Sequence, residues 1–213
     1  MILIGQYDSP FVRRVAIAMT LYGVAFRHRP WSTFGDGDKI AAYNPLRRAP
    51  TLILNDGRVI IESAYILDWL DEQVRDGDAD VMPLIAAAGP ERRTTLYYTA
   101  LATGFADKAV ALFYETVLHE VHSPVWLERC RTQLAAVLDQ LETIRVAAKS
   151  RWLQGAEMTH ADIALGCALR HARDAHGGTI GWEDWPALAF HSAQCEELDV
   201  FKAIQQPFAA PKV

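Results

Sequence analysis

Three short stretches of the sequence combine polar side chains with the expected start of a helix or a strand. The first is Ser9-Pro10, which follows the apolar run at residues 1–5 and precedes a helical pattern of apolar residues. Serine is a preferred N-cap, and proline is preferred at the first helical position. Ser9 is therefore either a plain helix cap or a hydroxyl placed where a helix N-terminus favours an anion.

The hydroxyl of Ser9 could activate a bound thiol without acting as a base. A hydrogen bond to a charged group is worth about 1.5–3 kcal/mol. Because one pKa unit corresponds to about 1.4 kcal/mol, donation to a thiolate would lower a thiol pKa of about 8.5 by roughly one to two units. Such a thiol would be largely ionised at neutral pH.

The second stretch is Ala49-Pro50, directly before the apolar run at residues 51–54. A proline at the first residue of a strand is compatible with an ordinary trans peptide bond. A cis bond would instead turn the backbone of Ala49 towards a ligand, which could pair with it like an added strand. These residues alone leave both interpretations open.

The third stretch is Glu62-Ser63, where a predicted strand ends and a predicted helix begins. A plain helix cap would explain Ser63. The pair also suits a zwitterion, because the backbone N–H and hydroxyl of Ser63 would hold a carboxylate and Glu62 would hold an ammonium group. The end group of an α-amino acid carries both charges.

All three stretches fall in one small predicted domain at residues 1–76. Hydrophobic patterns predict strands and helices in the order β-α-β-β-β-α, at residues 1–5, 10–22, 26–31, 51–55, 58–62 and 63–74. Asp56-Gly57 between the last two strands indicates a hairpin. The first two strands are joined through a helix and should be parallel. We therefore expect a four-stranded mixed sheet covered by helices.

The rest of the chain has a helical rhythm. The stretch at residues 75–91 is rich in Asp, Gly and Ala and contains two prolines, which places a linker at 77–89. Residues 90–213 are predicted to form an all-helical domain. Within it, Thr159 and Asp162 have the spacing of a capping box, a structural feature that begins a helix.

Composition argues against several other classes of protein. The 213 residues are 51% hydrophobic with a net charge of −5, and the charge is spread evenly. Nucleic acid is not an expected partner, because phosphate binding needs clustered cations.

No apolar run approaches the roughly 20 residues that span a bilayer, and no secretory signal is visible. The three cysteines are widely spaced, which favours a reduced, cytoplasmic protein. The seven histidines form no metal-binding pattern, so we expect no metal.

The order and spacing of these stretches together resemble the glutathione transferase family. The resemblance rests on Ser-Pro-Phe at 9–11, on Asn44-Pro45 followed by Pro50 before a strand, and on the hairpin followed by Glu-Ser. It covers the whole chain. It implies an α/β thioredoxin-like N-terminal domain (βαβ-ββα) followed by an all-α helical-bundle domain.

The resemblance also implies roles for individual residues. The backbone of Ala49, before a cis Pro50, would pair with the cysteinyl part of glutathione. Glu62 and Ser63 would bind its γ-glutamyl end. Arg48 falls near the glycyl carboxylate, where Arg47 could serve equally.

Ser9 matches the thiolate-stabilising position of the serine-type members, including bacterial ones. Tyr7 is the alternative, because several classes use a tyrosine at the end of the first strand as the hydrogen-bond donor. We favour Ser9, since the Ser-Pro turn interrupts the strand geometry that would align the two side chains. Arg13 and Arg14 lie too far into the helix to cap it, and we expect them to be solvated or to meet a partner subunit.

The resemblance implies a cytoplasmic, homodimeric detoxification enzyme. Such a glutathione transferase would use glutathione as co-substrate and would conjugate the glutathione thiolate to a hydrophobic, electrophilic small molecule. Catalysis would come from ionising the thiol and holding it close to the electrophile. Because positions 9 and 12 carry no cysteine, disulfide exchange is not expected. The alternatives are another glutathione-dependent reaction, namely dehalogenation, isomerisation or peroxide reduction, and a non-catalytic binding or scaffold protein with the same fold.

Overall fold

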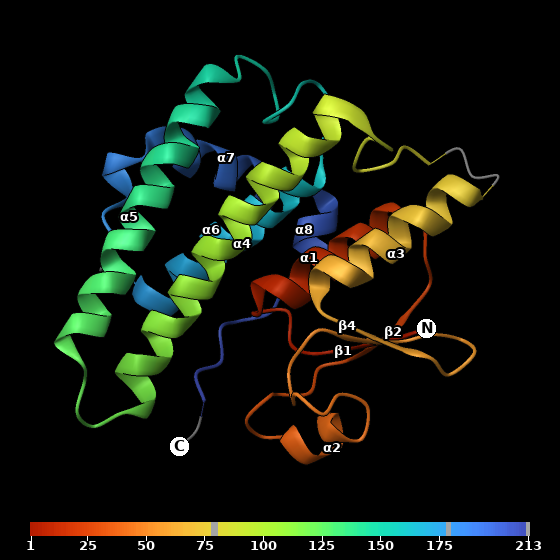
Figure 1. Ribbon diagram of the computed structural model, residues 1–213, viewed down its shortest axis with the longest axis horizontal. Helices are drawn as coiled ribbons and strands as arrows, with labels where there is room; N and C mark the ends of the chain where they lie inside the picture. Colours follow the sequence, from red (N-terminus) through yellow and green to blue (C-terminus); the bar gives the residue numbers. More distant parts are fainter. Residues whose placement is uncertain (78–80, 178–179, 212–213) are drawn as a thin grey trace. The chain divides into compact units, whose positions relative to one another are not determined.

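The structure, a computed structural model, describes residues 1–77, 81–177 and 180–211. The chain divides into two compact units: Met1–Ala86 together with the described residues from Asp199 onward, and Ala87–Leu198 (Figure 1). The domain boundaries expected from the sequence remain a prediction. Part of the linker predicted at 77–89, residues 78–80, lies outside the described residues. So does Gly178 of the Gly177-Gly178 pair, at which the sequence predicts the end of the helix that starts at Thr159.

The first unit contains the predicted four-stranded mixed sheet. Its strands are β1 (Ile2–Ile4), β2 (Arg27–Arg29), β3 (Thr51–Ile53) and β4 (Val59–Ile61), in the spatial order β2-β1-β3-β4. β1 is parallel to β2 and antiparallel to β3, and β3 is antiparallel to β4. The turn between β3 and β4 contains Gly57 at φ 86°, a backbone conformation that glycine adopts without strain. The thioredoxin-like fold expected for this half of the chain is confirmed.

Helices cover both faces of this sheet. α1 (Pro10–Leu21) and α3 (Ser63–Asp76) pack together on one face, and the short α2 (Gly37–Ala41) lies on the other (Figure 1). Ile40 of α2 is buried against Ile4 and Ile53 of the sheet. The strands therefore present side chains alternately to the two helical layers, as the period of two in a strand requires.

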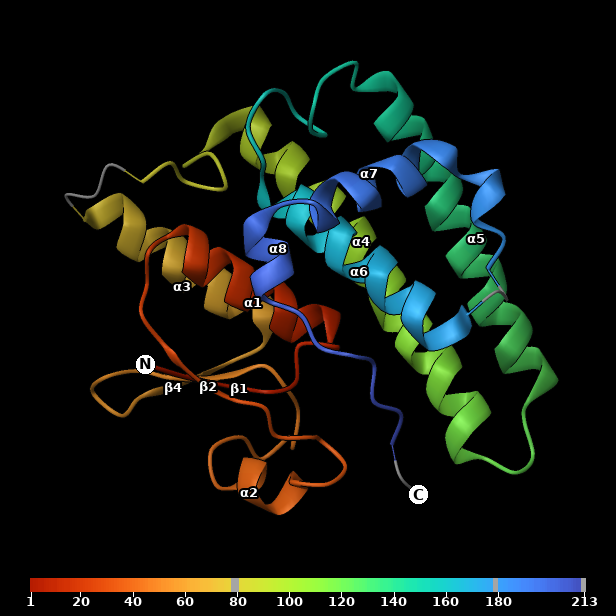
Figure 2. The same cartoon turned by 180° about the vertical axis from the view of Figure 1, so that it is seen from behind.

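The chain end returns to the first unit. α8 (Asp199–Ala203) packs against α1, as Figure 2 shows from behind. Beyond α8, the Gln206 Oε1 atom accepts a 2.8 Å hydrogen bond from the Tyr7 N–H, and the Ala209 N–H donates to Asp8 Oδ2 at 3.0 Å. These contacts place the described C-terminal residues beside the loop that precedes α1.

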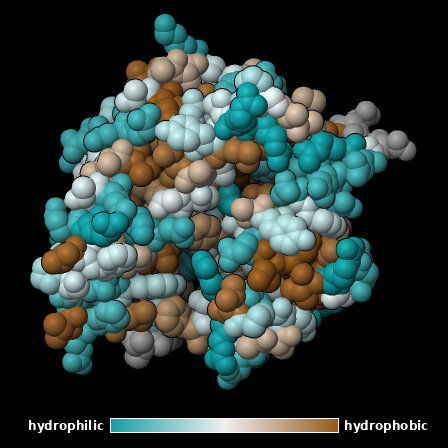
Figure 3. Space-filling view, in the orientation of Figure 1, coloured by the Kyte–Doolittle hydropathy of each residue, from teal (hydrophilic) through white to brown (hydrophobic). Residues whose placement is uncertain are grey.

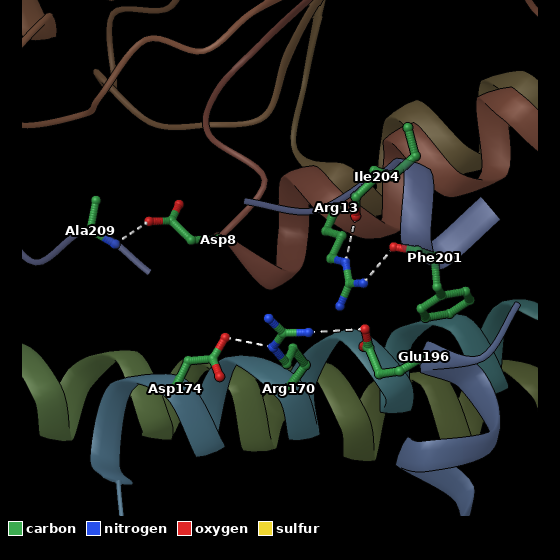
Figure 4. A network of polar contacts seen from close by, with 8 residues as sticks. All are labelled: Asp8, Arg13, Arg170, Asp174, Glu196, Phe201, Ile204 and Ala209. Carbon is green, nitrogen blue, oxygen red and sulfur yellow. Dashed lines mark hydrogen bonds and ion pairs between the residues drawn. The ribbon is translucent and has the colours of Figure 1, made fainter. Parts of the chain in front are cut away.

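The expectation that Arg13 and Arg14 are solvated is wrong. Their exposed fractions are 3% and 4%. Arg13 donates to the Ile204 carbonyl through Nε at 2.7 Å and to the Phe201 carbonyl through Nη2 at 3.0 Å (Figure 4). Both arginines are buried because α1 is covered by other elements of the unit, which periodicity within one helix does not reveal.

The second unit is helical, as predicted. It consists of α4 (Gly89–Leu118), α5 (Pro124–Ala147), α6 (His160–His176), the 3-10 helix η2 (Trp182–Asp184) and α7 (Pro186–Glu196). α6 packs against α4 and α7, and α4 packs against α5. The predicted capping box is present, with Thr159 as N-cap and its N–H donating to Asp162 Oδ2 at 2.9 Å. Across the described ranges, every helix is too short or too polar to cross a membrane.

Candidate functional site

Ser9 is the N-cap of α1, directly after the turn that follows β1. Its backbone is extended, at φ −71° and ψ 123°, and its Oγ accepts a 3.4 Å hydrogen bond from the Val12 N–H. No acidic side chain occupies the first turn of the helix. Because capping uses an acceptor lone pair, the hydroxyl proton of Ser9 can still be donated. The cap and a donor role are therefore compatible in the same side chain.

Gly5 allows the start of α1 and the loop at Ala49 to approach closely. A Cβ atom at Gly5 would lie 2.5 Å from Val12 Cγ2 and 2.7 Å from Ala49 Cβ, and the glycine has φ +129°. No other residue type fits there without displacing these neighbours. The sequence analysis did not single out Gly5. The pattern that could have indicated it is a glycine at the end of a strand, directly before a polar turn.

The Ala49–Pro50 peptide bond is cis, as the family resemblance implied. The loop that leads to it is held by Asn44, which is 1% exposed. The Asn44 amide donates to the Arg48 carbonyl at 3.0 Å and to Thr51 Oγ1 at 3.1 Å. Asn44 was missed as a site-supporting residue, although the Asn-Pro pair in the sequence marks it as a turn.

Glu62 is the N-cap of α3 and has φ 67° and ψ 122°. Positive φ is uncommon for a residue with a Cβ atom, and such conformations cluster at functional sites. Its carboxylate does not cap the helix and lies 3.5 Å from Arg48 Nη1. Arg47 pairs instead with Asp38 at 3.1 Å. These ion pairs are exposed, so they contribute little energy and a charged ligand can replace them.

Ser63 is the first residue of α3 and is 5% exposed. Its Oγ accepts hydrogen bonds from two nitrogens of Arg14, from Nε at 3.1 Å and from Nη2 at 2.8 Å. The first turn of α3 contains no acidic side chain. The helix N-terminus at Ser63 is therefore electropositive, as the zwitterion interpretation of Glu62-Ser63 requires.

The Tyr7 ring stacks on the His28 ring, with 3.8 Å between centroids and 5° between planes. His28 Nε2 is 2.7 Å from the Gly5 carbonyl oxygen. Burial raises the pKa of Tyr7 and lowers the pKa of His28. Tyr7 therefore keeps its proton at neutral pH and cannot serve as a base. The choice of Ser9 over Tyr7 as thiol donor remains a prediction.

The described residues contain no group of three or more His, Cys, Asp or Glu side chains arranged to hold a metal ion. The polar groups around Ser9, Ala49 and Ser63 are instead hydroxyls, backbone amides and a helix N-terminus. Hydroxyls, backbone amides and a helix N-terminus can bind the anionic groups of a small molecule.

Two family models match the chain. The model described as the N-terminal domain of glutathione S-transferase matches residues 3–77, and the model described as its C-terminal domain matches residues 124–191. The chain belongs to the glutathione S-transferase family. The family resemblance seen in the sequence is thus confirmed.

Relatives of this glutathione S-transferase family member support the assignment along its length. A probable glutathione S-transferase, GSTU1, from Oryza sativa subsp. indica is 26% identical, over 97% of this chain and 90% of the relative. A glutathione S-transferase from Methylobacterium radiotolerans, crystallised with glutathione sulfonate, is 26% identical, with a TM-score of 0.87 over 100% of this chain and 99% of that one. A family member from Pseudomonas fluorescens Pf-5 with bound glutathione is 28% identical, with a TM-score of 0.83 over 97% and 99% of the two chains.

Proposed function

We propose that this protein is a glutathione transferase that conjugates the glutathione thiolate to a hydrophobic, electrophilic small molecule. The observation that carries the proposal is that Ser9, Ala49, Glu62 and Ser63 stand at helix and strand starts of one compact unit. The close approach at Gly5 brings Ala49 next to Val12, in the first turn of the helix that Ser9 caps. The glutathione and glutathione sulfonate bound by two similar proteins support the choice of ligand.

The γ-glutamyl end of glutathione is assigned to Glu62 and Ser63. The N-terminus of α3 and the Ser63 hydroxyl would hold its carboxylate, because the first N–H groups of a helix have no intrahelical partner. Its ammonium group would pair with the Glu62 carboxylate, which lies 3.5 Å from Arg48 Nη1. The Arg48 side chain would then be released towards the glycyl carboxylate.

The cysteinyl part is assigned to the backbone of Ala49, and its sulfur to Ser9. Donation from the Ser9 hydroxyl would stabilise the thiolate and lower its pKa by roughly one to two units. Ser9 would act as a hydrogen-bond donor throughout, and the thiol proton would pass to solvent water, so no general base is needed. The remaining acceleration would come from holding the thiolate next to the electrophile.

Binding to immobilised glutathione tests the ligand. Wild type should be retained, whereas Glu62→Ala and Ser63→Ala should bind glutathione too weakly to be retained. Ser123→Ala is a matched control, because Ser123 is the N-cap of α5, also before a proline, and lies in the other unit. This control should be retained like wild type. Wild-type protein in the flow-through would refute glutathione binding.

Turnover separates the proposed enzyme from its alternatives. Purified protein is supplied with glutathione and a generic aryl halide or an unsaturated carbonyl compound, and conjugate is measured by mass spectrometry. Conjugate formation supports the proposal. Glutathione binding without conjugate would favour a binding protein or, if glutathione-dependent dehalogenation, isomerisation or peroxide reduction is seen, one of those reactions.

We also propose a homodimer that works in the cytoplasm. Each unit exposes large apolar side chains, among them Tyr65 at 58% on α3 and Tyr97 at 53% on α4. Figure 3 shows apolar residues exposed among polar ones on one face. The three cysteines, all among the described residues, are buried thiols outside any disulfide, which suits a reducing compartment. Light scattering after gel filtration should give twice the chain mass of 23.7 kDa; the mass of a single chain would exclude a stable dimer.

A further inference from the structure

Arg14 is buried in the first unit although it carries a charge. It lies on α1, is 4% exposed, and directs two donors at one oxygen, Ser63 Oγ on α3. The distances are 3.1 Å from Nε and 2.8 Å from Nη2. A buried guanidinium is costly to desolvate, so its contacts have large consequences for the groups it faces.

The guanidinium determines how the Ser63 hydroxyl is oriented. A serine hydroxyl has one proton and two acceptor lone pairs. With two N–H groups of a cation pointing at the oxygen, its lone pairs face Arg14 and its proton turns away from the positive charge. Ser63 is therefore held as a hydrogen-bond donor. Rotation of the hydroxyl into an acceptor orientation would bring its proton towards the guanidinium.

Ser63 stands at the N-terminus of α3, where its hydroxyl adds to other groups that attract an anion. As the first residue of α3, Ser63 also has a backbone N–H without an intrahelical acceptor. The hydroxyl, the N–H and the positive end of the helix dipole then act on the same side of an incoming group. Such a set favours an anion with acceptor oxygens over a neutral group.

We infer that Arg14 is a positioning residue that makes Ser63 an obligate donor, and thereby makes the site selective for the α-carboxylate of the γ-glutamyl end. This inference rests on the proposed binding of glutathione. Arg14 acts through Ser63, and need not contact the ligand.

A pair of ligands isolates this effect. Glutathione is compared with γ-aminobutyryl-cysteinyl-glycine, which lacks only that carboxylate, by titration calorimetry. Wild type should prefer glutathione by about 10-fold or more, since a hydrogen bond to a charged group changes affinity by at least that factor. In Arg14→Met the preference should fall by about 3-fold or more, because the hydroxyl is no longer oriented while the Ser63 N–H and the helix dipole remain. Arg14→Met with the wild-type preference would overturn the inference.

Arg13 offers a matched control on the neighbouring position. It is equally buried and also donates through Nε and Nη2, but to the main-chain carbonyls of Ile204 and Phe201. Arg13→Met should therefore destabilise the protein and keep the wild-type ratio of the two affinities. If Arg13→Met lowers the preference for glutathione over the analogue as much as Arg14→Met does, the cause is a general loosening of α1. That result would overturn the role of Arg14.

A double-mutant cycle keeps the inference testable if Arg14→Met does not fold. Arg14→Lys keeps the charge but cannot supply two parallel donors from a planar group. It should lower the preference in the wild-type background and leave it unchanged in the Ser63→Ala background. An equal effect in both backgrounds would show that Arg14 acts independently of Ser63. Wild type that binds neither ligand would instead refute the proposed function.

Discussion

The Arg13 Nε atom donates a 2.7 Å hydrogen bond to the carbonyl oxygen of Ile204, 191 positions later in the chain. Its Nη2 atom donates to the Phe201 carbonyl at 3.0 Å, and its guanidinium lies over the Phe201 ring, 5.2 Å from the centroid. The last carbonyls of a helix have no intrahelical donor. Arg13 therefore caps the C-terminus of α8 and joins the chain end to the helix that begins at Ser9 (Figure 4).

Replacing Arg13 with Met should release α8. Two buried carbonyls would lose charged donors, so we expect unfolding to become easier by about 2–4 kcal/mol in urea titrations. Limited proteolysis should also cut near residue 199 faster than in wild type. The control is Arg170→Met in the second unit, where Arg170 pairs with Asp174 and Glu196 at a partly exposed site (Figure 4). That change should cost about 1 kcal/mol or less; equal losses would contradict the capping role of Arg13.

Ser9→Ala should raise the pH at which the bound glutathione thiol ionises. We expect a shift of roughly one to two units in the pH profile of kcat/KM for the electrophile, measured at saturating glutathione, with a lower rate at neutral pH. The variant also loses a helix cap, worth about 1 kcal/mol. Ser123→Ala loses a similar cap of α5 and controls for that loss.

Tyr7→Phe tests the alternative hydrogen-bond donor to the thiol and keeps the ring that stacks on His28. Its pH profile should match that of wild type. A shift in Tyr7→Phe together with an unchanged Ser9→Ala profile would move the donor role to Tyr7.

Gly5→Ala should push apart the first turn of α1 and the loop at Ala49. The added Cβ atom would lie 2.5 Å from Val12 Cγ2 and 2.7 Å from Ala49 Cβ, and alanine is strained at φ +129°. We expect a loss of about 2–5 kcal/mol in chemical denaturation, together with weaker glutathione binding. In Gly57→Ala, where φ is +86° and no atom lies within 4 Å, only backbone strain of about 1 kcal/mol is expected. Similar losses in the two variants would rule out close approach as the reason for Gly5.

Stability should decline as the pH falls below about 6.5, the ordinary histidine pKa. Burial lowers the pKa of His191, which is 0% exposed, and also that of His28 and of His176. Below that pH the unfolded chain binds protons that the folded chain excludes, so protonation favours unfolding. The free energy of unfolding should therefore drop between about pH 7 and pH 5. His191→Gln should make this slope shallower, and an unaltered slope would exclude His191 as a source.

Local signals along the chain are enough to predict most strands and helices of both units. The hairpin at Asp56-Gly57 and the helix starts at Ser9 and Thr159 follow from signals within a few residues of each other. Hydrophobic period and capping chemistry act over such short distances, because they concern one strand or one turn of helix. The order of these elements was also sufficient to suggest the family.

The partners of the buried charged residues become visible only once the chain is folded. Arg13 and Arg14 are adjacent in sequence, yet one caps a helix 188 or more residues away and the other orients Ser63. The need for glycine at position 5 likewise arises from Val12 and Ala49, which meet it only in the folded unit. A side chain's burial and its hydrogen-bond partners depend on which elements pack around it, and that packing joins residues far apart in the chain.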